Sequence, residues 1–469
     1  MPGLLHSPHS LSLECDLERS LRCAQAIAKS QNAERILSFA QTVEPRDPLA
    51  AYRTLARAAG PTFFWQNRSR GEALAAGGAA RSLAAGPGHR FARARAFVRR
   101  CTDRLLRAGE QPAAGAGPYF ACSFTFFARG RGPRAFPPAT VLLPAIQLVC
   151  RPQGCTLVAN ASIGPHSDLD RIGALLAAQW QAVCQAPHSF PDPPLAECRL
   201  QAIPQSPAAY KGAVSRALAA IRSGKLRKIV LAHALEVSSP VALEPVAALE
   251  RLRQRHPDCY VFATRNSQGE SFVGASPERL LSLHDGWLTA DALAGSAPRG
   301  RDGGEDAERA AQLRASAKEQ REHRAVSDAL IQQLRALGLK PLRSPLQLRQ
   351  LSQIQHLWTP VQARLGPNLD PLDIAARLHP TPAVAGTPTQ AACERLHRFE
   401  SGDRGLYAAP LGWVDGRGNG ELVVGIRSAA IAGHRARLHA GAGIVAGSDP
   451  ERELAEVELK QRSLLSALA

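Results

Sequence analysis

The chain has 469 residues, of which 45% are hydrophobic and only 5% are aromatic. This length and this apolar content are sufficient for a large buried core, in one big domain or two modest ones. No stretch of about eighteen apolar residues occurs, so we expect no membrane-spanning helix and no membrane partner. The N-terminal segment, with Glu14, Asp16 and Glu18 directly after Met1–Leu13, resembles neither an export signal nor a transit peptide. We therefore expect a cytoplasmic protein.

The formal net charge of +17 raises the question of nucleic-acid binding. The excess is almost all arginine, with 7 lysines and 50 arginines among the 57 basic residues. The arginines are dispersed, and no zinc finger, RNA-binding strand motif or helix-turn-helix pattern accompanies them, so we expect no nucleic-acid partner. A positive surface would instead attract a small polyanionic substrate. A chain that prefers arginine should keep lysine where only an amine will serve, because a desolvated lysine can lose its proton and an arginine cannot.

Ten cysteines are scattered between Cys15 and Cys393. No CxxC pair occurs, and the closest pair, Cys150 and Cys155, has no matching second pair. The pattern therefore indicates neither a zinc site nor a disulfide framework. We expect reduced thiols, most of them buried as small hydrophobic residues.

The first 200 residues are rich in Ala, Arg and Gly and carry no chemical motif. Loop-like stretches cover residues 75–89, 108–118 and 186–196. Two helical stretches are predicted near residues 15–42 and 48–59. Strands are predicted at Thr62–Gln66, Ala121–Phe127 and Val141–Val149.

The second half of the chain has denser patterns. A helix is predicted over residues 205–223, and an amphipathic helix over Glu305–Leu337 ends at Gly338. A last helix begins after Ser448, a candidate N-cap with Glu451 three residues on. Strands are predicted at Lys228–Val237, Tyr260–Thr264, Ser271–Ala275, 406–414, 421–432 and 437–445, with a hairpin of Leu280–His284 and Trp287–Ala290 around Asp285–Gly286. Runs of strands with helices between them predict an α+β fold on antiparallel sheets.

Two of these helices carry pairs of glutamates three residues apart, Glu319 with Glu322 and Glu453 with Glu456. Each pair lies on one helix face, and Lys460 follows Glu456 by four residues. Four carboxylates from two helices could hold Mg²⁺, which prefers oxygen ligands. Taken alone, each pair is more typical of a solvated helix face.

Lys228 and Glu278 are candidates for proton transfer. Lys228 opens an apolar strand, although a lysine there usually reaches solvent. Glu278 follows a strand in Gly274–Glu278 (GASPE), where an exposed turn acid is the more ordinary reading. If Glu278 is buried, however, it could keep its proton to neutral pH and act as a general acid.

In this order the motifs resemble those of the chorismate-utilising enzymes, a family that includes isochorismate, salicylate, anthranilate and aminodeoxychorismate synthases. The resemblance runs from about Pro204 to the C-terminus. It rests on KIVLAH, FVGASPERLL, ALAGSAPRG, KEQREH, QHLWT, LHPTPAVAGTP, RGLYAAPLGW, GIRSA and HAGAGIVAGSDPERELAEVELK. The resemblance implies one α+β fold of large antiparallel β-sheets packed together with helices outside. Residues 201–469 would form the catalytic region, and residues 1–200 a divergent N-terminal part of the same domain.

The resemblance also implies a role for each candidate residue. Lys228 would activate a water for attack on the ring, and Glu278 would protonate the departing C4 hydroxyl. Four glutamates would surround Mg²⁺, which binds the substrate's ring carboxylate: Glu319, Glu322, Glu453 and Glu456. The remaining positions would hold the substrate, His356 beside the ring and Tyr407, Arg427, Gly441, Gly443 and Lys460 at its carboxylates.

Elementary chemistry agrees with these implied roles. Chorismate is a dianion, for which Mg²⁺, Arg427 and Lys460 would be positive partners. Lys228 has to be neutral to accept a proton. Glu278 has to be protonated to donate one, so the pKa of its carboxyl should be raised.

Within the family, two readings are weakened. Anthranilate synthases carry Gln where this chain has Lys228. Aminodeoxychorismate synthases typically carry a lysine in a PIKGT motif, where this chain has Leu293-Ala294-Gly295-Ser296. We therefore favour a Mg²⁺-dependent isochorismate synthase.

Other readings stay open. Salicylate synthases share Lys228 and Glu278 but tend to carry threonine where Ala383 stands. A catalytically silent chorismate-binding protein on the same fold is a further alternative. Phe63–Gln66 resembles an early strand of isochorismate synthases, which weakly favours menaquinone or phylloquinone synthesis. We expect a monomer.

Overall fold

The computed structural model describes residues 8–110, 117–130, 135–190, 200–203, 206–352, 354–366 and 369–469. None of the helices in these ranges is long and apolar enough to cross a membrane.

Two large β-sheets form the centre of the molecule. Their strands pair antiparallel except for β1 and β5, which pair in parallel. One sheet has the order β10 (Gln201–Ile203), β11 (Lys228–Ser238), β23 (Arg435–Ile444), β22 (Ser428–Ala432), β13 (Ser271–Ser276), β12 (Tyr260–Arg265), β2 (Thr62–Asn67), β3 (Glu72–Gly77), β8 (Ile146–Arg151), β9 (Gly154–Ile163), β1 (Arg35–Val43) and β5 (Leu105–Gly109), with β19 (Gly386–Thr387) paired to β11. The other has the order β16 (Leu342–Arg343), β18 (Ile354–Arg364), β15 (Trp287–Pro298), β14 (Arg279–His284), β21 (Gly420–Val424), β20 (Pro410–Asp415), β6 (Tyr119–Phe124), β7 (Ala139–Leu143) and β4 (Arg81–Ala85), with β17 (Gln347–Gln350) paired to β18.

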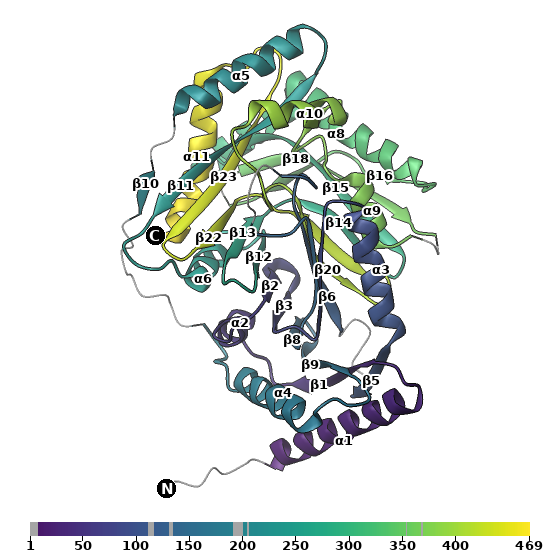
Figure 1. The fold of residues 1–469 in the computed structure, drawn as a ribbon. Helices are drawn as coiled ribbons and strands as arrows, with labels where there is room; N and C mark the ends of the chain where they lie inside the picture. Colours follow the sequence, from purple (N-terminus) through teal and green to yellow (C-terminus); the bar gives the residue numbers. More distant parts are fainter. Residues whose placement is uncertain are drawn as a thin grey trace.

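Helices cover the sheets from outside. They are α1 (Pro8–Ser30), α2 (Pro48–Ala56), α3 (Arg90–Asp103), α4 (Leu169–Cys184), α5 (Pro207–Arg222), α6 (Pro245–Arg255), α7 (Gly303–Ala315), α8 (Ala317–Ala336), α9 (Pro371–Leu378), α10 (Thr389–Phe399) and α11 (Pro450–Leu468), with a 3₁₀ turn at Arg68–Arg70. Figure 1 shows α11 alongside β23 and β11, and α1 beside α4 at the opposite end of the molecule. The α+β fold of packed, largely antiparallel sheets with external helices is confirmed.

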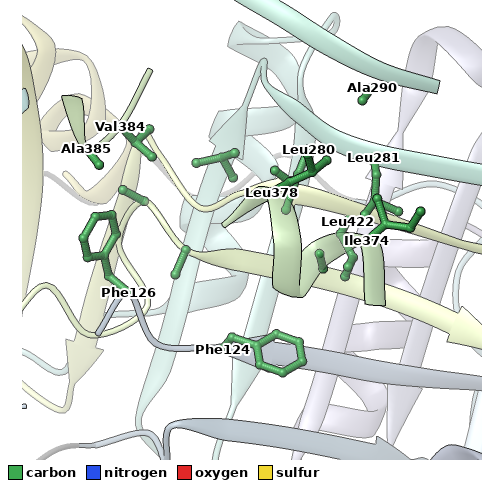
Figure 2. Packing of buried hydrophobic residues seen from close by; sticks show 14 of the residues in the cluster. Phe124, Phe126, Leu280, Leu281, Ala290, Ile374, Leu378, Val384, Ala385 and Leu422 are labelled. Carbon is green, nitrogen blue, oxygen red and sulfur yellow. The ribbon is translucent and has the colours of Figure 1, made fainter. Parts of the chain in front are cut away.

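The core has three buried layers. Aromatic side chains of both sheets, such as Phe262 and Trp413, fill the space between them. A second layer lies under α1, α2, α4 and α6, and a third under α3, α8 and α9. In Figure 2, Ile374 and Leu378 of α9 pack near Leu281 and Leu422 of the underlying sheet.

Strands from before and after residue 200 are neighbours in both sheets, since β2 pairs with β12 and β6 with β20. The proposed boundary at residue 200 therefore lies within continuous sheets. The division into a divergent part and a catalytic region stays a prediction about sequence and function.

Two predicted strands were wrong because each contains a crossing between the sheets. The run Val141–Val149 is β7 and β8, separated at Pro144, which has no backbone N–H to continue a ladder. The run 421–432 is β21 and β22, separated by a turn in which Arg427 has φ of +49°. A one-dimensional apolar pattern does not reveal which sheet a strand joins.

The helix predictions need three corrections. Glu305–Leu337 is two helices, because Ser316 is extended and its hydroxyl accepts a hydrogen bond from the Glu319 N–H at the start of α8. The stretch 15–42 is α1 followed by β1. The N-cap of α11 is Asp449, whose carboxylate accepts bonds from two backbone N–H groups, whereas the Ser448 hydroxyl bonds to the Val445 N–H.

Two of the predicted loops contain strands, whereas the predicted hairpin and thiols are present in the structure. Strands β3 and β4 enter the predicted loop 75–89, β5 enters 108–118, and much of 186–196 lies outside the described residues. The Asp285–Gly286 hairpin is confirmed, with φ of +49° and +78°. All the described cysteines are free thiols, and Cys198 lies outside the described residues.

Candidate active site

Lys228 is buried at the start of β11, with its side chain 11% exposed. Its Nζ lies 2.5 Å from Oε1 of Glu322 on α8, and this contact fixes the position of the amine beside the acid pair. Gly443 on the neighbouring strand β23 leaves room for this lysine. A Cβ at Gly443 would lie 2.9 Å from Lys228 Cε, closer than carbon atoms normally approach.

Glu278 lies where the chain crosses from β13 in one sheet to β14 in the other. Its backbone is fixed by hydrogen bonds from its N–H to the Ser276 hydroxyl and from the Val424 N–H to its carbonyl. Burial raises the pKa of its carboxyl from 4.5 to about 7, the nearby Lys228 opposes this shift, and Asp291 adds to it. Glu278 can therefore keep a proton near neutral pH, as a general acid requires.

The acid pair of α8 faces a bulge in β15. The pairing of β15 with β18 shifts between Leu293 and Ser296, and Gly295 within this bulge has φ of +80°. A Cβ at Gly295 would lie 3.2 Å from Oε2 of Glu319, and the Ser296 N–H donates to that carboxylate. Burial and then the charge of Glu322 raise the pKa of Glu319.

His356 and Arg427 lie near each other at the side of this cluster. His356 on β18 pairs with Ser296, and its Nδ1 lies 2.7 Å from the Ser296 hydroxyl. Burial first, and then the charges of Arg427 and Lys460, lower the pKa of His356 to about 3. The imidazole is therefore neutral at physiological pH and offers a neutral hydrogen-bonding group to a ligand.

Tyr407, Gly441 and Lys460 meet at the middle of β23. The hydroxyl of Tyr407 would lie 3.1 Å from a Cβ at Gly441, so glycine permits close approach there. Lys460 Nζ donates to the Gly441 carbonyl at 2.9 Å and to Glu456 at 2.8 Å. The ring of Tyr407 stacks on His439 of β23.

A buried ion pair between Arg404 and Glu400 lies against Tyr407. The guanidinium of Arg404 lies under the Tyr407 ring and is only 2% exposed. It donates to Glu400, to the Val384 carbonyl and to the Val230 carbonyl on β11. This network fixes the turn that carries Tyr407 against β11.

In the acid pair of α11, Glu456 is exposed and Glu453 is half-buried, whereas both acids of α8 are half-buried. Burial raises the pKa of Glu453, a hydrogen bond with Ser448 lowers it, and the charge of Glu456 raises it again. Lys318 acts electrostatically on both Glu319 and Glu453, so the two acid pairs share one cationic neighbour.

Both pairs have the oxygen donors that Mg²⁺ prefers, and a cation would relieve the repulsion within each pair. Across the described part of the chain, no group of three or more His, Cys, Asp or Glu side chains is close enough together to hold a metal ion. A magnesium ion at these carboxylates would thus have few direct protein ligands and would reach the other carboxylates through water or substrate oxygens, as Mg²⁺ commonly does.

The contacts connect the candidate residues in two groups. The first group surrounds the start of β11 and consists of Lys228, Glu278, Glu319, Glu322 and Gly443. The second group extends from there toward α11 and consists of His356, Arg427, Tyr407, Gly441 and Lys460. Glu453 and Glu456 join through Lys318 and Lys460.

The sequence interpretation missed four contributors: Asp291, Ser296, Lys318 and Arg404. Asp291 lies in an apolar strand, and a charged residue in such a strand is a signal that could have indicated it. Lys318 is one of the scarce lysines and stands beside Glu319. Ser296 and Arg404 had no comparable signal, because their roles depend on a bulge and on a turn.

A buried lysine and a buried acid beside paired carboxylates are features of an enzyme active site. A family model described as "Chorismate binding enzyme" matches residues 21–469, and the chain therefore belongs to the chorismate-binding enzyme family.

The chain is also similar to curated relatives and to a solved structure that are named isochorismate synthases. The chain is 33% identical over 460 residues to "Salicylate biosynthesis isochorismate synthase" of Pseudomonas aeruginosa, covering 95% of this chain and 93% of the relative. It is 39% identical over 297 residues to "Isochorismate synthase DhbC" of Bacillus subtilis, covering 61% of this chain and 71% of the relative. The solved structure of MenF, the menaquinone-specific isochorismate synthase from Escherichia coli, matches with a TM-score of 0.78 and 27% identity, over 98% of this chain and 100% of that one.

Proposed function

We propose that this protein is an isochorismate synthase, an isomerase that converts chorismate to isochorismate. The observation that carries the proposal is the arrangement of Lys228 and Glu278, two buried proton-transfer groups with opposite tasks. Lys228 takes a proton from the water that attacks C2. Glu278, whose pKa is raised to about 7, gives a proton to the hydroxyl that leaves C4.

Substrate binding is assigned to the second group of residues. Arg427 and Lys460 supply positive charge for the two carboxylates of chorismate. The neutral His356 contacts the ring, and Tyr407 donates from its hydroxyl beside Gly441. Gly441 and Gly443 leave space for the substrate next to the backbone of β23.

Magnesium is the proposed cofactor, held by Glu319, Glu322, Glu453 and Glu456. When bound, it would draw negative charge from the substrate's ring carboxylate. The half-buried pair of α8 supports this assignment, because the raised pKa of Glu319 reflects burial and repulsion by Glu322.

Salicylate synthase remains the second candidate, since it would use the same Lys228 and Glu278 and then eliminate pyruvate. Ala383, which stands where salicylate synthases tend to carry threonine, supports isochorismate as the final product. The relatives named above are called isochorismate synthases, including the one named for salicylate biosynthesis. Quinone synthesis, a monomeric state and a cytoplasmic location stay predictions.

The deciding experiment mixes the purified protein with chorismate and Mg²⁺, with and without EDTA, and separates the products by chromatography. We expect isochorismate, which disappears when EDTA is present. Salicylate with pyruvate would favour the second candidate. Binding of chorismate without conversion would indicate a catalytically silent member of the family.

A further inference from the structure

A small cavity of about 30 Å³ adjoins the proposed general acid. Glu278 lines it together with Arg279, Asp291, Gln333 of α8 and Thr381 of the segment after α9. The remaining wall is mostly apolar and includes Leu280 and Leu378, which lie beside each other in Figure 2. This volume is enough for one or two water molecules.

Four residues around this cavity each have a buried polar atom without a hydrogen-bond partner. The atoms are Arg279 Nε, Asp291 Oδ2, Gln333 Oε1 and Thr381 Oγ1. The described residues contain sixteen such atoms, and four of them belong to residues that line this one cavity. Asp291 is 9% exposed as a whole, and its other oxygen accepts a bond from Arg279 Nη2 at 2.9 Å. Buried polar atoms in folded proteins are seldom left without a partner.

The chemistry of these four atoms matches water better than any other small ligand. Two of them accept hydrogen bonds, one donates, and the threonine hydroxyl can do either. A water molecule has two donors and two acceptors, so it can satisfy all four kinds of group. A cation would be repelled by Arg279 and by Arg349, whose Nη1 lies 3.6 Å from Asp291 Oδ2. An anion would be repelled by Asp291.

We propose that this cavity binds ordered water, held by Asp291, Gln333 and Thr381, and that this water returns a proton to Glu278 after each turnover. The role rests on the proposed function. In that reaction Glu278 loses its proton to the C4 hydroxyl, which departs as water, and becomes a carboxylate. The cavity water then gives a proton to the carboxylate and is itself reprotonated from bulk solvent. Gln333 and Thr381 are only half-buried, so this side of the cavity lies toward the surface. Lys228 releases the balancing proton.

The water site is tested without using activity. A crystal structure at a resolution that shows ordered water should have water density in the cavity of the wild-type protein. The Gln333→Leu variant should lose at least one of these waters. Gln332→Leu is the matched control, because Gln332 is the exposed neighbour on the same helix and the substitution is identical. An empty cavity in the wild-type protein would overturn the proposal.

The relay role is tested by comparing one turnover with many. With enzyme in excess over chorismate, each protonated Glu278 needs to act only once, so Gln333→Leu and Gln332→Leu should react at the same rate. In the steady state Gln333→Leu should lower kcat roughly tenfold, a part of what positioned proton transfer contributes. Thr381→Val provides a second variant in case Gln333→Leu folds poorly.

The outcomes separate the two proposals. Equal steady-state kcat for Gln333→Leu, Thr381→Val and the Gln332→Leu control would overturn the relay. Failure of the wild-type protein to convert chorismate would overturn the proposed function, whereas water density in the cavity would still support the binding site.

Discussion

Helices α8 and α11 carry glutamate pairs with the same spacing, but the fold gives the two pairs different surroundings. On α8, Glu319 and Glu322 have side chains 21% and 23% exposed and contact a backbone N–H and a buried lysine. On α11, Glu456 is 51% exposed and pairs with Lys460 on its own helix. The same sequence pattern thus yields one pair built into the catalytic cluster and one pair at its rim.

The difference shows that the spacing of acidic residues on a helix does not determine their role. Charges become strongly coupled when burial removes the screening by water, and only the α8 pair is coupled directly to Lys228. We therefore expect changes around α8 to have larger effects than matched changes around α11.

The largest effect is expected for Lys228→Ala, which removes the partner of Glu322. Turnover of chorismate should fall by roughly 100- to 10,000-fold, the usual contribution of a general base. Product formation would be measured by chromatography, and circular dichroism would check the fold. Near-normal turnover would show that Lys228 is not the base.

Gly443→Ala and Gly441→Ala compare the two regions from the same strand. A Cβ at Gly443 displaces Lys228, whereas a Cβ at Gly441 approaches Tyr407 at 3.1 Å. A displaced catalytic group can cost on the order of 100-fold in rate. We expect Gly443→Ala to lower kcat by about that factor, and Gly441→Ala to act mainly on KM. Steady-state kinetics of both variants would test this, and equal effects on kcat would contradict it.

The acid pairs themselves are compared by Glu322→Gln and Glu456→Gln. We expect Glu322→Gln to weaken the dependence of activity on Mg²⁺ by roughly 10- to 100-fold, as changes at metal sites commonly do. Glu456→Gln should weaken it less, because its carboxylate is half-exposed and screened. Titrations of activity with Mg²⁺ would measure both values, and the reverse order would make α11 the main metal helix.

The pH dependence should report Glu278. Since this acid must be protonated and its pKa is about 7, kcat should fall as pH rises above 7. A flat profile between pH 6 and 9, in a buffer that keeps Mg²⁺ bound, would argue against Glu278 as the acid.

Stability provides an independent control for this acid. The pKa of Glu278 is higher in the folded protein than its usual 4.5. The contribution of Glu278 to the free energy of unfolding is therefore fully present below about pH 4.5 and is lost as the pH rises through about 7. The loss is at most about 3 kcal/mol. Glu278→Gln should therefore gain stability relative to the wild type between pH 5 and pH 9. Urea denaturation at both pH values measures this difference, in which any constant cost of the amide cancels.

The smallest effect is expected for Lys318→Ala, which removes the shared neighbour of both pairs. Lys318 is 65% exposed, so water screens its charge. Affinity for Mg²⁺ should rise by no more than about fivefold, because one competing cation is lost. A decrease in affinity would show that Lys318 orients the carboxylates.

The two catalytic candidates could be predicted from the sequence because short motifs carry them, namely KIVLAH for Lys228 and FVGASPERLL for Glu278. The motifs did not reveal the environment of these residues. Lys228 is buried, and the structure places the Glu322 carboxylate of α8 against it, a contact that no motif records. Asp291, which adds to the raised pKa of Glu278, comes from another strand.

The sequence by itself determined the local elements and the residue types of the site, because strand alternation, turn residues and helix caps act over a few neighbouring residues. Only the tertiary structure decided which strands join which sheet. Glu278 and Arg427 lie at two opposite crossings between the sheets, which hydrogen bonds from the Ala275 N–H to the Arg427 carbonyl and from the Val424 N–H to the Glu278 carbonyl hold together. Residues some 150 positions apart become neighbours there because both sheets bury their apolar faces against each other, and no local pattern records that pairing.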